Sequence, residues 1–351
     1  MSPADADLVA ARAAAESLVG GSVDLIKRAA TGGRNSKIYL VRQGKRQFAL
    51  KKYPPASDDP RNRLETELRA LDLMTRHGIR NVPQAVAGDV RQGYALIEWI
   101  EGEAVTMPNA GDIEAAVAFL AAVDRLRRVE EARLQPLASE ACLSGAEVVA
   151  QIQRRLSRLD TVAASEPALR ALIEDELCPL LSSFSANAEA GYVKAQIRFE
   201  AAISAENQTL CPSDFGFHNA LRPPDGELCF IDFDYFGWDD PAKLVADFLL
   251  HPGMTLSVGL KQRFYTLVSD LYGRDTEFET RLHLLFPLFG LRWCAILLNE
   301  FLPERWSART RAGGQTDWYE AKQRQLARVR KFVQMLKTEP AYFSNGGVNP
   351  F

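Results

Sequence analysis

Alternation of apolar and polar residues predicts strands in the first third of the chain. Five short segments are rich in β-branched and aromatic residues and are joined by turn sequences, which is typical of strands; they are 23–30, 36–43, 46–53, 85–90 and 94–100. The first three follow one another closely and predict an antiparallel meander. Its first turn, TGGRN at 31–35, is rich in glycine.

Helical spacing of apolar residues appears twice in this region and dominates the rest of the chain. Residues 5–19 form an alanine-rich amphipathic pattern, and residues 58–79 have helical spacing with Pro60 at the first helical position. Beyond residue 105 the same spacing predicts helices at 111–128, 145–160, 166–184, 187–205, 260–273, 278–301 and 315–337. We therefore predict an α+β protein in which a β-rich part and a larger helical part meet near residues 101–105.

Two short strands are predicted inside the helical part, at 209–212 and 227–234, with the turn sequence PPDG between them. We expect these strands to form a hairpin. Polar residues stand around it among short apolar stretches, where an unpaired carboxylate is costly to bury; they are Asp214, Asn219, Asp232 and Asp234. The arrangement indicates a site that requires negative charge and oxygen ligands.

Asp214, Asn219 and Asp232 offer two carboxylates and an amide oxygen, a ligand set that suits Mg²⁺. Phosphoryl transfer uses such a metal, together with a carboxylate that orients the attacking hydroxyl and accepts its proton. The alternative is that these residues form Asx turns and cap a following turn. That alternative is favoured for any one residue, and the site is favoured for the whole set.

A second group of residues suits the phosphates of a nucleotide. Strand alternation places Lys51 and Lys52 on opposite faces of the sheet, so one faces solvent and the other can reach across the glycine-rich turn. That turn brings backbone N–H groups close to phosphate oxygens; its candidate residues are Gly32, Gly33, Asn35 and Ser36. The alternatives are an ordinary turn and a solvated lysine.

Glu67 lies near the apolar stripe of the 58–79 helix, where a carboxylate can pair with Lys51 and hold it in place. Glu65 is the rival candidate. The alternative for both is a solvated charge on the helix surface.

The connector between the two parts, LIEWI followed by EGE at 96–103, exposes backbone donors and acceptors beside apolar side chains. Such a connector suits an adenine ring, which makes Glu98 and Ile100 candidate nucleotide contacts. The alternative is an ordinary interdomain linker.

Composition narrows the classes of function. The 351 residues are enough for two domains, and a formal net charge of −3 gives no electrostatic reason to expect nucleic-acid binding. The N-terminus lacks the basic region and apolar core of a signal peptide. The five cysteines are scattered and form no C-x-x-C pair. We therefore expect a cytoplasmic protein without a zinc site or disulfides.

The most apolar stretch, 282–298, is interrupted by Pro287, Gly290 and Arg292. We expect a buried helix pair there rather than a membrane span. The basic segment RWSARTRAGG at 305–314 is predicted to be a loop, and is either a contact for an anionic group or a solvated run.

The histidines are predicted to have no metal role. His218 precedes Asn219 and is expected to line the site, whereas His77, His251 and His283 are isolated in the sequence and are expected to be structural.

Taken together, these residues resemble the aminoglycoside phosphotransferase and choline kinase family. Asp214, Asn219 and Asp232 in FIDFD are similar to the catalytic and metal-binding segment of that family. Further similar segments follow in the family's order, namely GGRNSKIYLV (32–41), FALKKY (48–53), ETELRALDLMTRHGIRNVP (65–83), YALIEWIEGE (94–103) and GWDDPAKLVADFLL (237–250). The resemblance covers most of residues 23–105 and 205–250. It implies a two-lobed protein-kinase-like fold, with an N-lobe at 1–100 and a C-lobe at 101–351.

The resemblance also implies a role for each candidate residue. ATP would lie between the lobes, with its phosphates held by Lys51, which Glu67 would pair. Asn219 and Asp232 would bind Mg²⁺, and Asp214 would be the catalytic base. The acceptor would be a hydroxyl of a small molecule such as a sugar, amino sugar, amino alcohol or aminoglycoside, with no nucleic-acid or membrane partner.

The sequence departs from the family pattern in places. Pro212 and Ser213 precede Asp214, where the family usually has His-Gly, and Leu244 stands where a further aspartate is common. A nucleotide-binding pseudokinase with a regulatory or scaffold role is therefore the alternative to an active kinase. A protein kinase is less attractive, because the chain lacks the His-Arg-Asp and Asp-Phe-Gly patterns. The basic residues Arg305, Arg309 and Arg311 favour a sugar or a partly anionic acceptor over a polycationic one.

Overall fold

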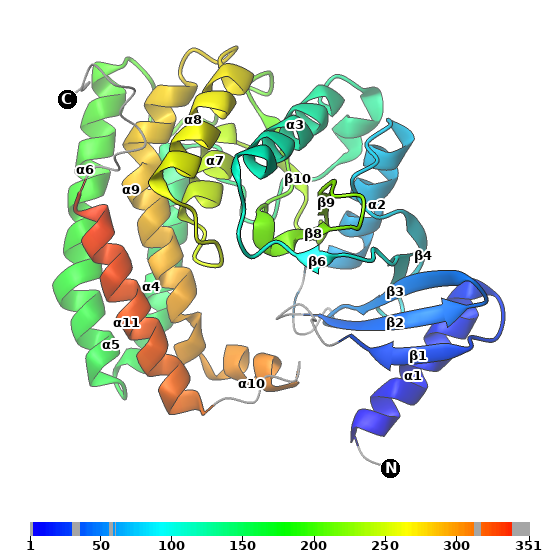
Figure 1. Ribbon diagram of the computed structural model, residues 1–351. Coiled ribbons are helices and arrows are strands. Elements are labelled where there is room, and N and C mark those ends of the chain that lie inside the picture. The colour runs from blue at the N-terminus through cyan, green and yellow to red at the C-terminus, as the bar shows by residue number, and fades with distance from the viewer. Residues whose placement is uncertain (1–2, 30–35, 56–58, 60, 312–316, 339–351) are drawn as a thin grey trace.

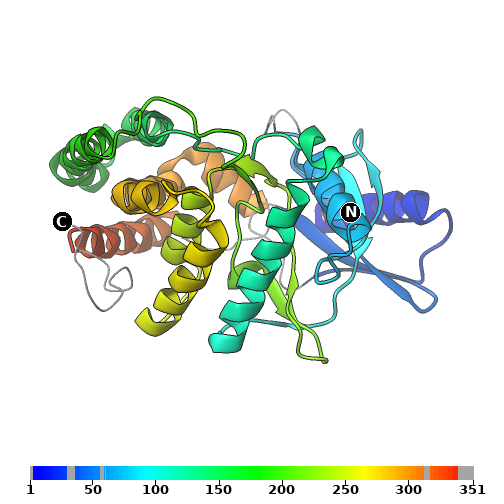
Figure 2. The same cartoon turned by 90° about the horizontal axis from the view of Figure 1, so that it is seen from above.

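The computed structural model describes residues 3–29, 36–55, 59, 61–311 and 317–338. A β-rich first part is followed by a larger helical part, which confirms the predicted α+β class (Figure 1). Viewed from above, short strands lie in the middle of the molecule, between the blue sheet and the orange and red helices (Figure 2).

The first part is built on a five-stranded antiparallel sheet in the order β1-β2-β3-β5-β4. Its strands all lie within predicted segments; they are β1 Leu25–Arg28, β2 Lys37–Gln43, β3 Arg46–Lys52, β4 Ala85–Asp89 and β5 Tyr94–Glu98. Helix α1, Pro3–Val19, lies along this sheet (Figure 1). Its buried alanines share one apolar cluster with Val41, Leu50 and Leu96 of the strands.

Helix α2, Arg63–Arg76, connects the sheet to the helical part. The side chain of Asn62 accepts a hydrogen bond from the N–H of Glu65 and caps the helix, so the predicted start at Pro60 is wrong. The inner face of α2 belongs to the same apolar cluster as helix α3, Ala110–Leu126, through Ala70, Leu71 and Met74. The core therefore continues from one part into the other.

The helical part contains further helices around α3. They are α4 Gly145–Ala163, α5 Pro167–Leu172, α6 Cys178–Lys194, α7 Pro241–Leu250, α8 Val258–Tyr272, α9 Phe278–Leu297, α10 Pro303–Arg311 and α11 Trp318–Leu336. A π-helical turn, η2 Ile173–Leu177, joins α5 to α6, and a 3₁₀ turn, η1 Glu130–Leu134, follows α3. The predicted helix at 187–205 is wrong, because α6 runs on to Lys194 and residues 195–205 are not helical.

Helix α9 continues through Pro287, so the predicted helix pair is wrong. Together with the 3₁₀ turn η4, Leu298–Phe301, it is the one helix in the described ranges that is long and apolar enough to cross a membrane. Within its most apolar window 67% of the helix is buried inside the protein, as in the core helix of a soluble protein. Helix α9 instead packs against α4, α6, α7 and α11.

Two helices were not predicted. Every residue of α7 is buried, so its sequence carries no alternation between an apolar and a polar face. Helix α10 replaces the loop that was predicted from residue 305 onward, as far as Arg311.

The strands around the acidic residues pair differently from the predicted hairpin. Strand β7, Thr209–Cys211, pairs with β10, Gly237–Asp239. Strand β8, Ala220–Arg222, pairs across the PPDG turn with β9, Cys229–Phe230, and on its other side with β6, Glu103–Ala104. The loops that follow β7 and β9 are therefore held close together, and they carry Asp214 and Asp232.

Candidate active site

Lys51 on β3 is buried among carboxylates. Its Nζ lies 2.7 Å from Oε2 of Glu67 and 2.5 Å from Oδ1 of Asp232. Oδ2 of Asp234 is 3.4 Å away. Burial alone would lower the pKa of Lys51, but these carboxylates raise it well above its usual value, which keeps the ammonium charged.

The structure selects Glu67 over Glu65 as the partner of Lys51. Glu67 is buried on α2 and also accepts hydrogen bonds from the hydroxyl of Tyr53 and from the backbone N–H of Phe233, the latter at 3.2 Å. Glu65 instead pairs with Arg69 near the surface. Glu67 thereby joins the helix of the first part to the loop that carries Asp232.

Lys52 lies on the opposite face of the strand, as strand alternation predicts. Its ammonium donates to the backbone oxygen of Gln92 and sits 4.0 Å from the ring centroid of Tyr94. It is not among the residues that line the cleft described below.

Arg63 is a site residue that the sequence prediction missed. Its Nε donates to Oδ2 of the buried Asp234 at 3.0 Å, and a second guanidinium nitrogen donates to the same oxygen. Arg63 lies four residues before Glu67 on α2, so both side chains share one helix face. That spacing was a usable signal. Burial and the neighbouring charge of Asp232 raise the pKa of Asp234 to about 7, although Lys51 and Arg63 oppose this rise.

The loop after β7 holds Asp214 in a tight turn. The N–H of Asp214 donates to the backbone oxygen of Pro212 at 3.0 Å, and Ser213 between them has φ of 68°. This left-handed conformation favours glycine, the residue that the family usually has here. Ser213 therefore adopts a backbone conformation that suits glycine, at the expense of local strain.

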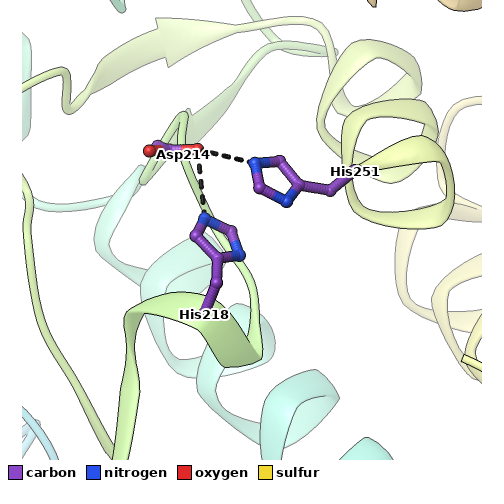
Figure 3. Close-up of side chains that lie close together, drawn as sticks. All are labelled: Asp214, His218 and His251. Atoms are coloured by element: carbon purple, nitrogen blue, oxygen red, sulfur yellow. Dashed lines mark hydrogen bonds and ion pairs between the residues drawn. The ribbon is translucent and has the colours of Figure 1, made fainter. Parts of the chain in front are cut away.

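Two histidines hydrogen-bond to Asp214 (Figure 3). Nε2 of His218 lies 3.2 Å and Nε2 of His251 3.3 Å from Oδ1 of Asp214. Burial alone would raise the pKa of Asp214, but these hydrogen bonds hold it well below its usual range. The prediction treated His251 as an isolated structural residue and missed this contact, because 37 residues separate it from Asp214 in the sequence.

The protonation of His251 follows from its surroundings. Its Nδ1 accepts a hydrogen bond from the N–H of Gly253 at 3.1 Å, so Nε2 carries the proton that is donated to Asp214. Burial lowers the pKa of His251, which favours this neutral form. The rings of His218 and His251 are stacked 3.7 Å apart at 5°. Parallel rings direct their nitrogens alongside one another, which suits hydrogen bonds to one carboxylate better than a shared metal ion.

Asn219 ends the 3₁₀ turn η3, Phe217–Asn219, directly before β8. Its amide nitrogen donates to the backbone oxygen of Asp214 at 2.9 Å, so the amide oxygen is the atom that it offers to a ligand. The backbone oxygen of Asn219 accepts from the N–H of Ile231 at 2.9 Å. This bond connects Asn219 to the residue before Asp232. Asp232 itself has φ of 69°, which turns the chain just after β9.

A cleft of about 610 Å³ brings the predicted residues together. Its lining includes Ser36, Lys51, Asp214, Asn219 and Asp232. The hydroxyl of Ser36 is buried without a hydrogen-bond partner, as expected of a group that meets a ligand.

Other predicted nucleotide contacts are not brought to this cleft. Glu98 and Ile100 are not in its lining, and the carboxylate of Glu98 accepts from the N–H of Gln84 at 3.1 Å. Gly32, Gly33 and Asn35 lie outside the described residues. A second hollow of about 790 Å³ between α3 and β8 contains none of the predicted site residues.

Comparisons with known proteins agree with this arrangement. Solved structures with the same fold include spectinomycin phosphotransferase in complex with ADP and spectinomycin, at 12% identity and a TM-score of 0.61, covering 91% of this chain and 94% of that one. Choline kinase LicA from Streptococcus pneumoniae has 15% identity and a TM-score of 0.56, covering 92% and 97%. Ethanolamine kinase from Plasmodium vivax has 13% identity and a TM-score of 0.55, covering 88% and 82%. These likenesses establish the predicted kinase-like fold.

A search of curated proteins finds no match. The model of the phosphotransferase enzyme family (APH), however, matches residues 26–278, which is well over half of the chain and includes Lys51, Asp214 and Asp232. The chain therefore belongs to the phosphotransferase enzyme family, as its sequence resemblance implied.

Proposed function

We propose that this small-molecule kinase transfers the terminal phosphoryl group of ATP, in the presence of Mg²⁺, to a hydroxyl of its acceptor. The observation that supports this most directly is the cleft in which Lys51, Asp232, Asn219 and Asp214 meet. A buried ammonium, two carboxylates and an amide oxygen in one cleft form the set that phosphoryl transfer requires. When bound, Mg²⁺-ATP supplies the phosphoryl group and the divalent charge that offsets its oxygens.

The chain's own residues would act by binding and positioning. Lys51, held by Glu67, would pair with phosphate oxygens. Asn219 and Asp232 would bind Mg²⁺, because this ion takes oxygen ligands and these side chains offer an amide oxygen and a carboxylate. Asp232 has 31% of its side chain exposed and is free to face a ligand while it contacts Lys51.

Asp214 would orient the acceptor hydroxyl and accept its proton. Both histidines donate to Oδ1, which leaves Oδ2 with one long contact, 3.4 Å from the amide nitrogen of Asn219. Oδ2 is therefore the oxygen that would take the proton. The pseudokinase alternative is not favoured, because Lys51, Asp214, Asn219 and Asp232 are all present and Ser213 preserves the turn.

Substitution of Lys51 tests the proposal with its neighbour as a matched control. We expect Lys51→Met to lower ATP-dependent ADP release by at least a hundredfold across a panel of sugars, amino alcohols, aminoglycosides and hydroxy acids. Lys52→Met, on the other face of the strand, should stay within about twofold of the native enzyme. Omission of Mg²⁺ should abolish the signal. Equal loss in the two variants, or ADP release without a divalent ion, would contradict the proposal.

A further inference from the structure

The cleft carries more positive than negative charge, although the whole chain has a net charge of −3. Eight of its lining residues are lysine or arginine and five are aspartate or glutamate. Some of these cations are close to the proposed phosphate site. Others line the far end of the cleft, beside helices α4, α10 and α11, where an acceptor would bind.

At this end several arginines surround one carboxylate. Arg155 on α4 donates to Oε2 of Glu140, and Arg292 on α9 lies 3.3 Å from the same oxygen. The backbone of Glu140 is in the left-handed region, with φ of 58°. The side-chain amide of Gln151 donates to the backbone oxygen of Glu140 at 3.0 Å and holds this residue in place. One carboxylate therefore serves two guanidinium groups.

Positive charge is concentrated around Arg155, although Glu304 offsets part of the charge of Arg305. Arg292 is balanced by Asp247 at 3.3 Å, but Arg305 on α10 adds a further charge near Arg155. Burial together with the charges of Arg292 and Arg305 lowers the pKa of Arg155 even though Glu140 is in contact. A group that is held beside excess like charge gains stability when an anion binds there.

Buried polar atoms line the same end of the cleft. Gln325 on α11 is 8% exposed, and its amide oxygen has no hydrogen-bond partner. The indole nitrogen of Trp293 on α9 is also buried without a partner, and the ring of Trp293 packs edge-on against His251. The amide oxygen of Gln325 and the indole N–H of Trp293 thus offer an acceptor and a donor to hydroxyl groups of a ligand that approaches Asp214.

We propose that the acceptor is a hydroxylated acid, whose carboxylate or phosphate group binds Arg155 and Arg305 while its hydroxyls meet Trp293 and Gln325. This inference rests on the proposed kinase function. It predicts that the cleft binds anionic acceptors in preference to cationic aminoglycosides or amino alcohols. Bidentate pairing with arginine suits both carboxylate and phosphate, so the experiment must distinguish them.

Pairs of acceptors that differ only in charge test the proposal. ADP release is measured with gluconate against sorbitol, and with glucose 6-phosphate against glucose, with kanamycin as a cationic compound. We expect kcat/KM to be at least tenfold higher for an anionic compound than for its neutral counterpart. Preference for gluconate identifies a carboxylate acceptor, and preference for glucose 6-phosphate identifies a phosphate. Preference for a neutral or cationic compound overturns the inference and leaves the kinase function intact.

Arginine variants link that preference to the pocket. Arg155→Gln and Arg305→Gln should each raise KM for the anionic acceptor at least tenfold, with a smaller effect on kcat. Arg154→Gln is the matched control, because Arg154 is 61% exposed beside Arg155 and pairs with Glu147 outside the cleft. Equal effects of all three substitutions would overturn the assignment.

A binding measurement decides the case in which none of these compounds is phosphorylated. Gluconate and glucose 6-phosphate, added to enzyme saturated with Mg²⁺-ADP, should raise the unfolding temperature of the native protein and of Arg154→Gln. They should have no effect on Arg155→Gln or Arg305→Gln. Absence of stabilisation by either anion in the native protein overturns the inference. Absence of stabilisation by Mg²⁺-ADP itself is a separate result and counts against the proposed function.

Discussion

The environment of Asp214 is set by residues that come from three different segments. Ser213 turns the backbone, His218 follows on the next turn, and His251 arrives from the end of α7. A base that takes a proton from a hydroxyl must be held within hydrogen-bond reach of it, so these contacts act on rate through position.

Loss of His251 should slow turnover without weakening nucleotide binding. In His251→Ala the Oδ1 atom of Asp214 loses one of its two histidine donors, and we expect kcat to fall by about tenfold. The KM for ATP should change by less than about twofold. His251→Gln, which keeps an N–H donor, should recover part of the rate.

His283→Ala provides the control, because His283 contacts Tyr265 and does not line the cleft. Steady-state kinetics with a saturating acceptor give both constants. An unchanged kcat in His251→Ala would show that His218 alone positions Asp214.

Glycine at position 213 should stabilise the protein. Ser213 occupies the left-handed region at a cost of about 1 kcal/mol, and glycine removes it at a smaller cost in unfolded-state entropy. We expect Ser213→Gly to raise the unfolding temperature by about 1–3 °C. Ser213→Ala keeps the strained backbone and should give no increase. A lower unfolding temperature for the glycine variant would contradict the strain argument.

The sequence was sufficient to place residues whose partners follow from local pattern. Strand alternation placed Lys51 and Lys52 on opposite faces, and the resemblance to the family favoured Lys51 and Glu67 as the pair. Arg63 and His251 were missed for a different reason. Their partners are 171 and 37 residues away in the chain, so only the packing of the two parts shows the contact.

Among the elements, α7 leads directly to the site, and it is one of the two helices that the sequence did not predict. Its N-cap is Asp240, whose Oδ1 accepts from the N–H of Ala242 at 2.8 Å. The same carboxylate accepts from Arg281 on α9 at 2.9 and 3.0 Å. Since α7 ends directly before His251, this buried pair fixes one helix that reaches Asp214.

Removal of the charge on Asp240 should therefore destabilise the fold. Asp240 and Arg281 are each 2% exposed, and loss of one member of a buried pair leaves the other uncompensated. We expect Asp240→Asn to cost about 3 kcal/mol in urea unfolding, reduced where Asp275, 2.6 Å from Arg281, retains part of the compensation. Glu320→Gln, in an exposed pair with Arg324, should change stability by less than about 0.5 kcal/mol. Equal effects would show that the buried pair contributes no more than a surface one.

Prediction of elements worked where the apolar pattern is periodic or the residues are typical of strands. Strand β2 and helix α2 have one buried face, so their apolar spacing is visible in the sequence, whereas β3 and β5 are buried on both faces and were identified by composition. Helix α7 is buried all round, and α9 continues through Pro287. The strands β7 to β10 were paired wrongly, since segments of two or three residues carry no register information.

At the scale of the whole molecule, charged side chains connect the sheet to the helical part across the cleft. Lys51, Glu67 and Arg63 come from the first part, and Asp232 and Asp234 come from the second. The apolar core also continues through α2. The two parts are therefore joined by a core on one side and by ionic contacts on the other, with the cleft between them.

Glu140 gives this assembly a pH dependence whose sign can be stated. It links α4 to α9 through Arg155 and Arg292, and although burial alone would raise its pKa, the two arginines lower it below the usual 4.5. A carboxylate with a lowered pKa contributes stability above the unfolded-state pKa, and that contribution is lost as the pH falls through the folded-state pKa.

Glu140→Gln should therefore have a lower unfolding temperature than the native protein at pH 7. The gap should remain constant down to about pH 5 and close below pH 4.5, where the native glutamate becomes protonated. Thermal unfolding between pH 7 and pH 3.5 measures the gap, with Glu320→Gln as a variant for which none should appear. A gap that does not narrow below pH 4.5 would mean that the Glu140 side chain stabilises the fold through packing rather than through its charge.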